Sequence, residues 1–150
     1  MYLVNMLYVS RTDPSFNPDD IAQILESSAR NNARRGITGI LAFNSSYFLQ
    51  CLEGSRSAVN GAYHAILNDK RHHSPVLLAY HEIHQRQFPQ WAMGYIGENL
   101  FSQEILLRYS NSSEFKPYEL SGQSAAGLLV ELASHVPTLS SVPHLKTVSN

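Results

Sequence analysis

The chain has 150 residues, of which 43% are hydrophobic and 15% charged, and its formal net charge is −1. This length allows one domain with a sizeable core and a short extension. The near-neutral charge argues against binding to nucleic acid or to an anionic membrane surface, and no apolar run approaches the roughly 18 residues of a transmembrane helix. The single cysteine, Cys51, excludes an internal disulfide, and the first ten residues lack a secretory signal, so we expect a cytoplasmic protein.

A strand and a helix open the chain. Residues 2–10 are rich in Leu, Val and Tyr and predict a β-strand. Asn17 is placed to cap a helix, with Pro18 at its first position and two acidic residues after it. The residues that helical spacing turns toward the core are Ile21, Ile24, Leu25 and Ser28. We expect this helix to end near Asn32, with Gly36 as a breaker.

Two strands and a second helix follow. Residues 37–43 and 47–53 flank the polar turn Asn44-Ser45-Ser46, and this pattern predicts a β-hairpin. Ser55 can cap a second helix. The buried stripe of that helix is predicted to contain Val59, Tyr63, Ile66 and Leu67.

Two further strands complete the predicted sheet, one over residues 76–84 after Pro75 and one over residues 91–96. The element order is therefore β-α-β-β-α-β-β. Two helices on one face of such a sheet make an α+β, ferredoxin-like fold with an added strand. We assign this domain to residues 1–97.

The rest of the chain differs in character. Residues 102–109 and 123–135 predict two helices, and together they form a C-terminal helical extension over residues 98–136. The apolar stripe of the second helix is predicted to contain Leu128, Leu129, Leu132 and Val136. Residues 137–150 are rich in Ser, Pro and Thr, so we expect a flexible tail. The extension is too short to be an output enzyme.

Gln50 is the first candidate functional residue. The third predicted strand places Phe48, Gln50 and Leu52 on one face and Tyr47, Leu49 and Cys51 on the other. Gln50 thus lies between two large apolar neighbours, on the side expected to face the helices. A buried amide must find hydrogen-bond partners. Taken alone, such a glutamine more often bonds to a neighbouring strand, a hydroxyl or a water.

Three further polar residues are predicted near the same layer. Asn31 and Asn32 follow Ile24 at helical spacing and close the first helix near its core-facing side. Tyr8 lies near the end of the first strand. Each has an ordinary explanation, a helix terminator for the asparagines and core packing for the tyrosine. Together with Gln50 they describe an apolar cleft between two helices that suits a planar heteroaromatic ligand.

Four stretches of the sequence form an ordered set of motifs: NNARRGITGIL (31–41), YFLQCLEG (47–54), NDKRHHSP (68–75) and FPQWAMGY (88–95). They resemble the successive signatures of BLUF domains, photoreceptors that sense blue light through a flavin. Tyr8 also stands at the expected place. The segment after the domain resembles that of short, stand-alone BLUF proteins of the cyanobacterial PixD type.

The resemblance implies roles at the edge of a flavin ring held between the two helices. Tyr8 would donate an electron and a proton to the excited flavin and recover both within the photocycle. Gln50 would bridge the tyrosine hydroxyl and the N5/O4 edge, and would rearrange its amide by rotation, tautomerisation or both. Asn32 would hold the pyrimidine edge of the ring, with Asn31 adjacent.

The resemblance also implies contacts farther from that edge. Residues expected to pack on the ring are Ile24, Phe48 and Ile66. Residues expected at the ribityl and phosphate part are Asp69, Arg71, His72 and His73. Many family members carry an arginine where this chain has Ala65, and its absence leaves the tail contacts and the choice between FAD and FMN open. The expected cofactor is FAD, with FMN or riboflavin as alternatives. Trp91 and Met93 would pass the signal outward, and either could lie near Gln50.

The expected function is that of a sensor, not an enzyme. Because no output domain is visible, signalling is expected through association, with a homo-oligomer and a separate regulatory protein such as a response-regulator-like partner. A flavin-binding regulator without photoactivity and a small ferredoxin-like flavoenzyme are the alternatives. We expect no metal site, because His81 and His84 should face opposite sides of a strand and no matched acidic pair accompanies His72 and His73.

Overall fold

The computed structural model describes residues 2–17 and 20–135. Its helices and strands are β1 (Leu3–Thr12), α1 (Ile21–Arg35), β2 (Thr38–Phe43), β3 (Tyr47–Ser55), α2 (Arg56–Leu67), β4 (His72–Ile83), β5 (Gly94–Ile96), the 3-10 turn η2 (Glu98–Leu100), α3 (Gln103–Tyr109), the 3-10 turn η3 (Pro117–Glu119) and α4 (Gly122–Ser134). The sheet order is β4-β1-β3-β2-β5. Neighbouring strands are antiparallel except β2 and β5, which are parallel. The predicted ferredoxin-like α+β fold is confirmed.

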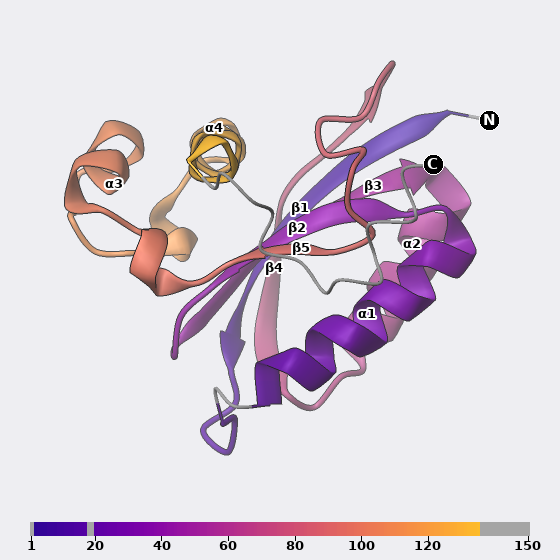
Figure 1. The fold of residues 1–150 in the computed structure, drawn as a ribbon, viewed down its shortest axis with the longest axis horizontal. Helices are drawn as coiled ribbons and strands as arrows, with labels where there is room; N and C mark the ends of the chain where they lie inside the picture. Colours follow the sequence, from indigo (N-terminus) through magenta and orange to yellow (C-terminus); the bar gives the residue numbers. More distant parts are fainter. Residues whose placement is uncertain (1, 18–19, 136–150) are drawn as a thin grey trace.

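The sheet separates two layers of helices. Figure 1 shows α1 and α2 together on one face and α3 and α4 beyond the other. Each face has its own buried cluster. The cluster between the sheet and α1 and α2, the helix-side core, includes Val4, Met6, Tyr8, Ile24, Leu25, Leu41, Phe48, Leu52, Val59 and Met93. The cluster between the sheet and the C-terminal helices α3 and α4, the cap-side core, includes Leu7, Val9, Ile40, Leu49, Cys51, Ile96, Leu106, Phe115, Leu128 and Leu132.

Strand alternation assigns residues to these two cores. Leu49 and Cys51 of β3 lie in the cap-side core, whereas Phe48 and Leu52 lie in the helix-side core. The side chains of an extended strand point alternately to the two faces of its sheet, so a strand buried on both faces serves two cores. The predicted face of Gln50, toward α1 and α2, is therefore the observed one.

The ends of α1 differ from the prediction. The helix continues to Arg35 instead of ending near Asn32, because Gly36 adopts a left-handed conformation (φ 67°) directly after it. The amide groups of Gly36 and Ile37 donate to the carbonyls of Ala33 and Asn32, which satisfies carbonyl groups left free by the last turn.

The start of α1 is also later than predicted. The helix begins at Ile21 after Asp20, whose side chain makes no capping hydrogen bond. The N-cap is thus Asp20 and not the predicted Asn17, whose carbonyl accepts from the Asp20 amide at 2.7 Å. Pro18, predicted at the first helical position, and Asp19 lie outside the described residues.

The last two strands also differ in their bounds. β4 begins at His72 rather than after Pro75, because it stays paired with β1 across Ser74, the one described non-glycine residue with positive φ. The register between β1 and β4 shifts twice, between Leu7 and Tyr8 and between Val9 and Arg11. β5 contains only Gly94–Ile96, and Trp91 to Met93 precede it as an irregular segment.

The second helix begins as predicted. The Ser55 side chain accepts a hydrogen bond from the amide of Ala58 and caps α2. Val59 is fully buried, while Tyr63 and Ile66 are partly buried against the helix-side core. Leu67, predicted to be part of the buried stripe, is 44% exposed because it lies at the last position of the helix.

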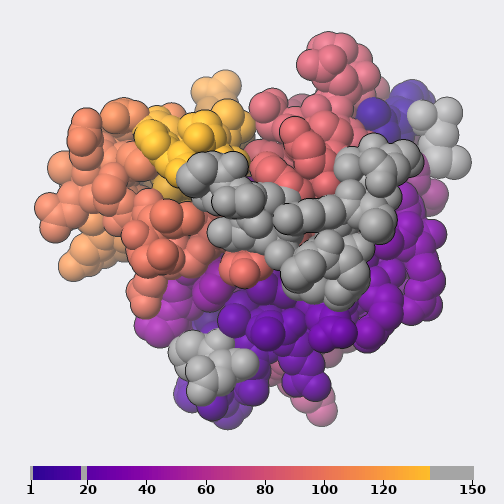
Figure 2. All heavy atoms as spheres, in the orientation of Figure 1, coloured from indigo at the N-terminus to yellow at the C-terminus, as the bar shows by residue number. Residues whose placement is uncertain are grey.

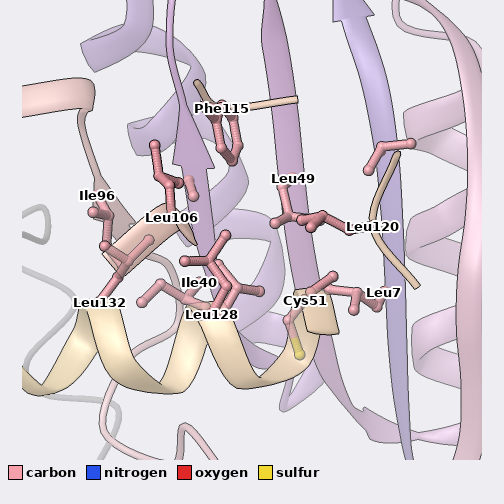
Figure 3. Close-up of a cluster of buried hydrophobic side chains, with 14 of the residues drawn as sticks. Leu7, Ile40, Leu49, Cys51, Ile96, Leu106, Phe115, Leu120, Leu128 and Leu132 are labelled. Carbon is pink, nitrogen blue, oxygen red and sulfur yellow. The ribbon is translucent and has the colours of Figure 1, made fainter. Parts of the chain in front are cut away.

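The C-terminal helices cover the far face of the sheet. Leu128, Leu129 and Leu132 of α4 are buried as predicted and pack on the sheet (Figure 3). A Cβ at Gly122 would lie 2.8 Å from the Leu78 carbonyl oxygen, so glycine lets the start of α4 approach β4 closely. Figure 2 shows these helices, in orange and yellow, as a lobe beside the indigo and purple body. Residues 98–135 thus form half of one core and are more than an appendage.

The remaining predictions for the C-terminal region concern residues that the structure does not describe. Val136 and the predicted flexible tail, residues 137–150, lie outside the described residues. Within residues 2–17 and 20–135, no helix is long and apolar enough to cross a membrane.

Candidate functional site

A chain of polar contacts crosses the helix side of the sheet. Tyr8 and Gln50 lie directly opposite each other on β1 and β3. The Tyr8 hydroxyl donates to the Gln50 side-chain oxygen, and the Gln50 amide nitrogen points to the Met93 sulfur at 3.4 Å. A thioether is a weak acceptor, so the amide donor has only a weak partner. Gln50 therefore has one strong and one easily exchanged contact.

Burial keeps Tyr8 protonated. Its side chain is 3% exposed, and the ring lies 5.6 Å from that of Tyr63. Desolvation by burial raises the pKa of Tyr8 far above its ordinary value, with smaller contributions from Tyr63 and Asp69. The neutral phenol is the form that can donate to Gln50. The site thus holds a proton at the Tyr8 oxygen across the physiological pH range.

The raised pKa of Tyr8 predicts its behaviour in alkali. An unfolded tyrosine ionises near pH 10, but the folded phenol resists ionisation, so the stabilising effect of keeping Tyr8 neutral is present below about pH 10 and is lost above it. We expect an ultraviolet titration of the native protein to miss the ionisation of Tyr8, which appears on unfolding. Tyr8→Phe should leave the native titration unchanged and remove one tyrosinate from the unfolded one. An equal loss from both titrations would show that Tyr8 is accessible.

The two asparagines at the end of α1 face differently. Asn32 is buried, and its amide donates to the carbonyl oxygen of Ala92 at 2.8 Å. Asn31 is exposed but lines the same pocket. The contact of Asn32 ties α1 to the segment that carries Met93. The side-chain amides of Gln50 and Asn32 thus both reach residues just before β5.

Two adjacent pockets lie between α1, α2 and the sheet. Their volumes are about 110 and 40 Å³, and they share the lining residues Ser28, Gln50, Ile66, Asp69 and Arg71. The apolar lining of the smaller pocket includes Ile24, Leu41 and Phe48. Every residue predicted to contact the flavin, except His73, lines one or both pockets. A ring that occupies both must displace the side chains that now separate them.

The outer end of the pockets carries the charged groups. Asp69 and Arg71 form an ion pair in which the Arg71 Nε lies 2.9 Å from Asp69 Oδ1. This hydrogen bond from Arg71 lowers the pKa of Asp69. Ala65, which replaces the arginine of many family members, lines the larger pocket with Arg71 and Arg35. A cation is therefore still available at this end.

The two histidines at the start of β4 lie in different environments. His72 is buried, its Nε2 lies 2.6 Å from the Ile66 carbonyl oxygen, and its buried Nδ1 has no hydrogen-bond partner in the structure. His73 is exposed and lines neither pocket. Adjacent residues of a strand point to opposite faces, so the structure does not bring His73 to the predicted site.

Met93 and Trp91 lie on opposite faces of the sheet. Met93 is fully buried and contacts Gln50, whereas Trp91 packs against the cap-side core with its ring 6.3 Å from that of Phe88. The sequence left open which of the two faces the site, and in this structure Met93 does.

Sequence reasoning missed several lining residues. Ser27, Arg35, Leu52 and Ala62 line the larger pocket, and Leu41 lines the smaller one. Arg35 is four residues after Asn31, so helical spacing could have placed it on the same face. Leu41 lies opposite Gln50 across β2 and β3, and only the strand register identifies such a neighbour.

The residues present fit a flavin. A flavin ring has a broad apolar face and an edge of carbonyl and nitrogen acceptors, and both need partners. The apolar lining can cover the ring, while the Gln50 amide nitrogen has only a sulfur partner and the buried His72 Nδ1 has none. These groups can bind polar atoms of a flavin, Gln50 at the ring and His72 toward the tail, without breaking strong existing hydrogen bonds.

Comparison with known proteins agrees with this geometry. A family model described as "BLUF: Sensors of blue-light using FAD" matches residues 3–94. The chain belongs to the BLUF family. Its domain contains all the lining residues of the two pockets, and the description of the family names FAD as the cofactor.

Relatives of this BLUF domain differ in size. The blue light- and temperature-regulated antirepressor BluF of Escherichia coli strain K12 is 30% identical over 106 residues, which cover 71% of this chain and 26% of that protein. Against photoactivated adenylate cyclase subunit beta of Euglena longa, the chain spans 14% of the relative's length. These curated relatives are thus much longer than the chain.

Solved structures of similar length also match. The dark-state structure of BlrB, described as a BLUF protein, has a TM-score of 0.71 and 31% identity, covering 87% of this chain and 94% of that one. The ground state of BlsA has a TM-score of 0.77 and 26% identity, covering 99% of each chain. The C-terminal helices of this BLUF protein therefore have counterparts in similar structures.

The His, Cys, Asp and Glu side chains of the BLUF protein are the candidate metal ligands. Among the described residues, no group of three or more His, Cys, Asp or Glu side chains is arranged to hold a metal ion. His81 lies on β4 and His84 just beyond its end, and both are exposed.

Proposed function

We propose that this protein is a blue-light photoreceptor that holds a flavin non-covalently between α1 and α2. The observation that carries the proposal is the contact chain from Tyr8 through Gln50 to Met93 along the wall of the pockets. It places an oxidisable phenol, a two-sided amide and a weak acceptor in one row.

The residues of the site have different proposed roles. A flavin bound here supplies an excited state that can oxidise a nearby phenol, and ring atoms that accept hydrogen bonds. Tyr8 gives up an electron and its phenolic proton and takes both back within the photocycle. Gln50 carries a hydrogen-bond donor and an acceptor on one amide group. Rotation or tautomerisation of this amide therefore changes which of the two faces Tyr8 and which faces the ring edge. Asn32 and the adjacent Asn31 hold the pyrimidine edge, and Ile24, Phe48 and Ile66 pack on the ring.

The absorbance spectrum of the purified protein tests the proposal directly. We expect a flavin spectrum that shifts slightly to the red after blue light and returns in the dark, because changed hydrogen bonds at the ring edge stabilise the excited state. Absence of flavin after reconstitution with FAD, FMN and riboflavin would contradict it. So would lasting bleaching without the shift.

The tail contact assigned to Arg71 gives a second test. With alanine at position 65, Arg71 is the cation next to Asp69 at the pocket mouth. Charge-assisted hydrogen bonds are worth about 1.5–3 kcal/mol, so Arg71→Ala should weaken FMN and FAD binding roughly tenfold or more. Riboflavin, which has no phosphate, should bind almost as before. Fluorescence titration with the three flavins measures this.

The control for that test is Arg34→Ala, which removes an exposed arginine that lines neither pocket. It should leave all three affinities unchanged. If Arg71→Ala weakened the binding of riboflavin and of FMN equally, Arg71 would maintain the shape of the pocket and would not bind the phosphate. His72 and Asp69 are proposed to complete the same end of the site.

The output is proposed to be a change in association rather than a reaction. Trp91 and Met93 lead through β5 to α3 and α4, whose outer faces could bind a partner. A homo-oligomer and a separate regulatory protein, such as a response-regulator-like partner, are the proposed partners. The E. coli relative is named an antirepressor, which supports regulation through protein binding. A cytoplasmic location is proposed from the single, buried cysteine.

A further inference from the structure

The segment that carries Trp91 and Met93 has little regular structure of its own. Residues 84–93 connect β4 to β5 through bends and turns. Yet Met93 is fully buried and its sulfur is held 3.4 Å from the Gln50 amide nitrogen. A ten-residue irregular segment needs anchors to hold one atom so closely. Asn32 binds the Ala92 carbonyl near its end, and two charged side chains anchor its beginning.

The first anchor is Glu53, at the far end of β3 from the turn. Its side chain is completely buried. The carboxylate accepts from the amide of Phe88 at 2.7 Å and from the amide of Gln87 at 2.9 and 3.0 Å, one distance to each oxygen. The Asn5 side-chain nitrogen donates to its second oxygen at 3.0 Å. Both oxygens face only N–H donors, which is the pattern of an ionised carboxylate.

The second anchor is Arg86, the residue just before the two amides. One of its terminal nitrogens lies 2.7 Å from the Gly36 carbonyl oxygen, and the other lies 2.8 Å from Thr38 Oγ1 and 3.1 Å from the Glu53 carbonyl oxygen. These acceptors lie just after the end of α1, at the start of β2 and near the end of β3. Arg86 thus ties the segment to three elements of the flavin-binding domain.

We propose that Glu53 and Arg86 form a clamp that positions the segment 84–93 and thereby keeps Met93 at Gln50. Glu53 is three residues from Gln50 on one strand, so β3 holds both the clamp and the amide in fixed relation. The clamp grips main-chain amides, so its hold does not depend on the side chains at positions 87 and 88. Glu53 and Arg86 act as positioning residues and do not touch the flavin.

The energetic cost of Glu53 supports a dedicated role. A buried carboxylate is costly unless its hydrogen bonds replace water, and an apolar residue at this place would avoid that cost. The two residues before Glu53 on β3, Cys51 and Leu52, are apolar and buried. The charge is retained where it meets the start of the irregular segment, while the Trp91 carbonyl at the other end accepts from the Gly39 amide at 2.9 Å.

The clamp rests on the proposed function for its consequence, but its geometry can be tested without flavin. We would prepare Glu53→Gln and measure hydrogen exchange of the Gln87 and Phe88 amides in the flavin-free protein. We would also measure quenching of Trp91 emission by acrylamide, since Trp91 is the only tryptophan. Glu53→Gln turns one acceptor oxygen into a donor that faces the donors of Asn5 and Gln87.

The clamp predicts a local effect. Exchange at Gln87 and Phe88 should accelerate about tenfold or more, and Trp91 should become more accessible, while the amides at the centre of β3 keep their protection. In the flavin-loaded protein, the dark absorbance maximum and the recovery rate should both change, because Met93 no longer holds one place at Gln50. Uniform loss of protection across the sheet would overturn the proposal, since Glu53 would then serve only stability.

Two further variants sharpen the result. In Asn5→Asp/Glu53→Gln the new carboxylate can accept from the new amide, so protection and recovery rate should return toward the original values. Glu82→Gln removes an exposed carboxylate paired with Arg56 at 2.8 Å and should change nothing. Failure of the double variant to recover, or an equal effect of Glu82→Gln, would count against the clamp.

The outcomes for the clamp and for the proposed function can be told apart. If the original protein shows no red shift, the proposed function fails, while exchange and Trp91 quenching still decide whether Glu53 holds the segment. If the red shift is normal and Glu53→Gln loosens the two amides without altering recovery, the photoreceptor stands and the clamp's role in positioning Met93 is wrong. An Arg86→Lys variant should give a smaller change of the same kind, because lysine cannot reach all three oxygens.

Discussion

Gln50→Leu is expected to abolish the reversible red shift while leaving the flavin bound. Leucine fills a similar volume between Phe48 and Leu52, but it can neither accept from Tyr8 nor offer a donor to the ring edge. The Tyr8 hydroxyl then loses its acceptor in a buried place, which costs about 1–3 kcal/mol of stability. Light-minus-dark difference spectra and chemical denaturation measure the two effects.

A double substitution provides the matched control for Gln50→Leu. Tyr8→Phe should also abolish the shift, because it removes the oxidisable phenol. The combined Tyr8→Phe/Gln50→Leu variant should be less destabilised than the sum of the single variants, because it leaves no orphaned hydroxyl. A normal photocycle in either single variant would remove that residue from the proposed mechanism, and additive stability losses would mean that the two side chains do not interact.

Leu128→Ala is expected to have the largest effect on stability. Leu128 is 1% exposed and lies between α4 and the sheet (Figure 3). Truncating such a leucine removes apolar contacts and leaves a cavity, at a cost of about 2–5 kcal/mol. Urea denaturation followed by circular dichroism should show a lower midpoint with little change in slope.

Leu107→Ala is the corresponding exposed control. Leu107 on α3 is 53% exposed, so its truncation should change stability by no more than about 0.5 kcal/mol. One cooperative transition is expected for all these variants, because α4 and the sheet share the cap-side core. Two separate transitions in Leu128→Ala, with the flavin still bound after the first, would show that the helices fold independently of the sheet.

Alternation predicted the site best where the chain is a regular strand. The face of Gln50 followed from its neighbours Phe48 and Leu52, and β3 is regular throughout, so the inference was confirmed. Helix-start signals and helical spacing likewise predicted the Ser55 cap and the buried leucines of α4. These features depend on residues close together in the sequence, so a local pattern is enough to identify them.

Other features depend on pairing between distant segments. Ser74 and Pro75 look like strand breakers, yet β1 keeps the start of β4 in the sheet. Trp91 and Met93 could not be assigned to faces because the segment before Gly94 is not a strand. The sequence also left the Glu53 clamp unseen, because its partners are main-chain amides 34 and 35 residues away.

The division of the molecule into two cores has a consequence for how such sensors diversify. If the protein signals through partners as proposed, exposed residues of α3 and α4 such as Leu107 and Val130 can change what it presents to them without touching the pocket wall. Light detection and recognition can thus be selected nearly independently, with the short β5 as their shared boundary. On the proposed function, a lineage can therefore acquire a new partner while the photochemistry is inherited unchanged.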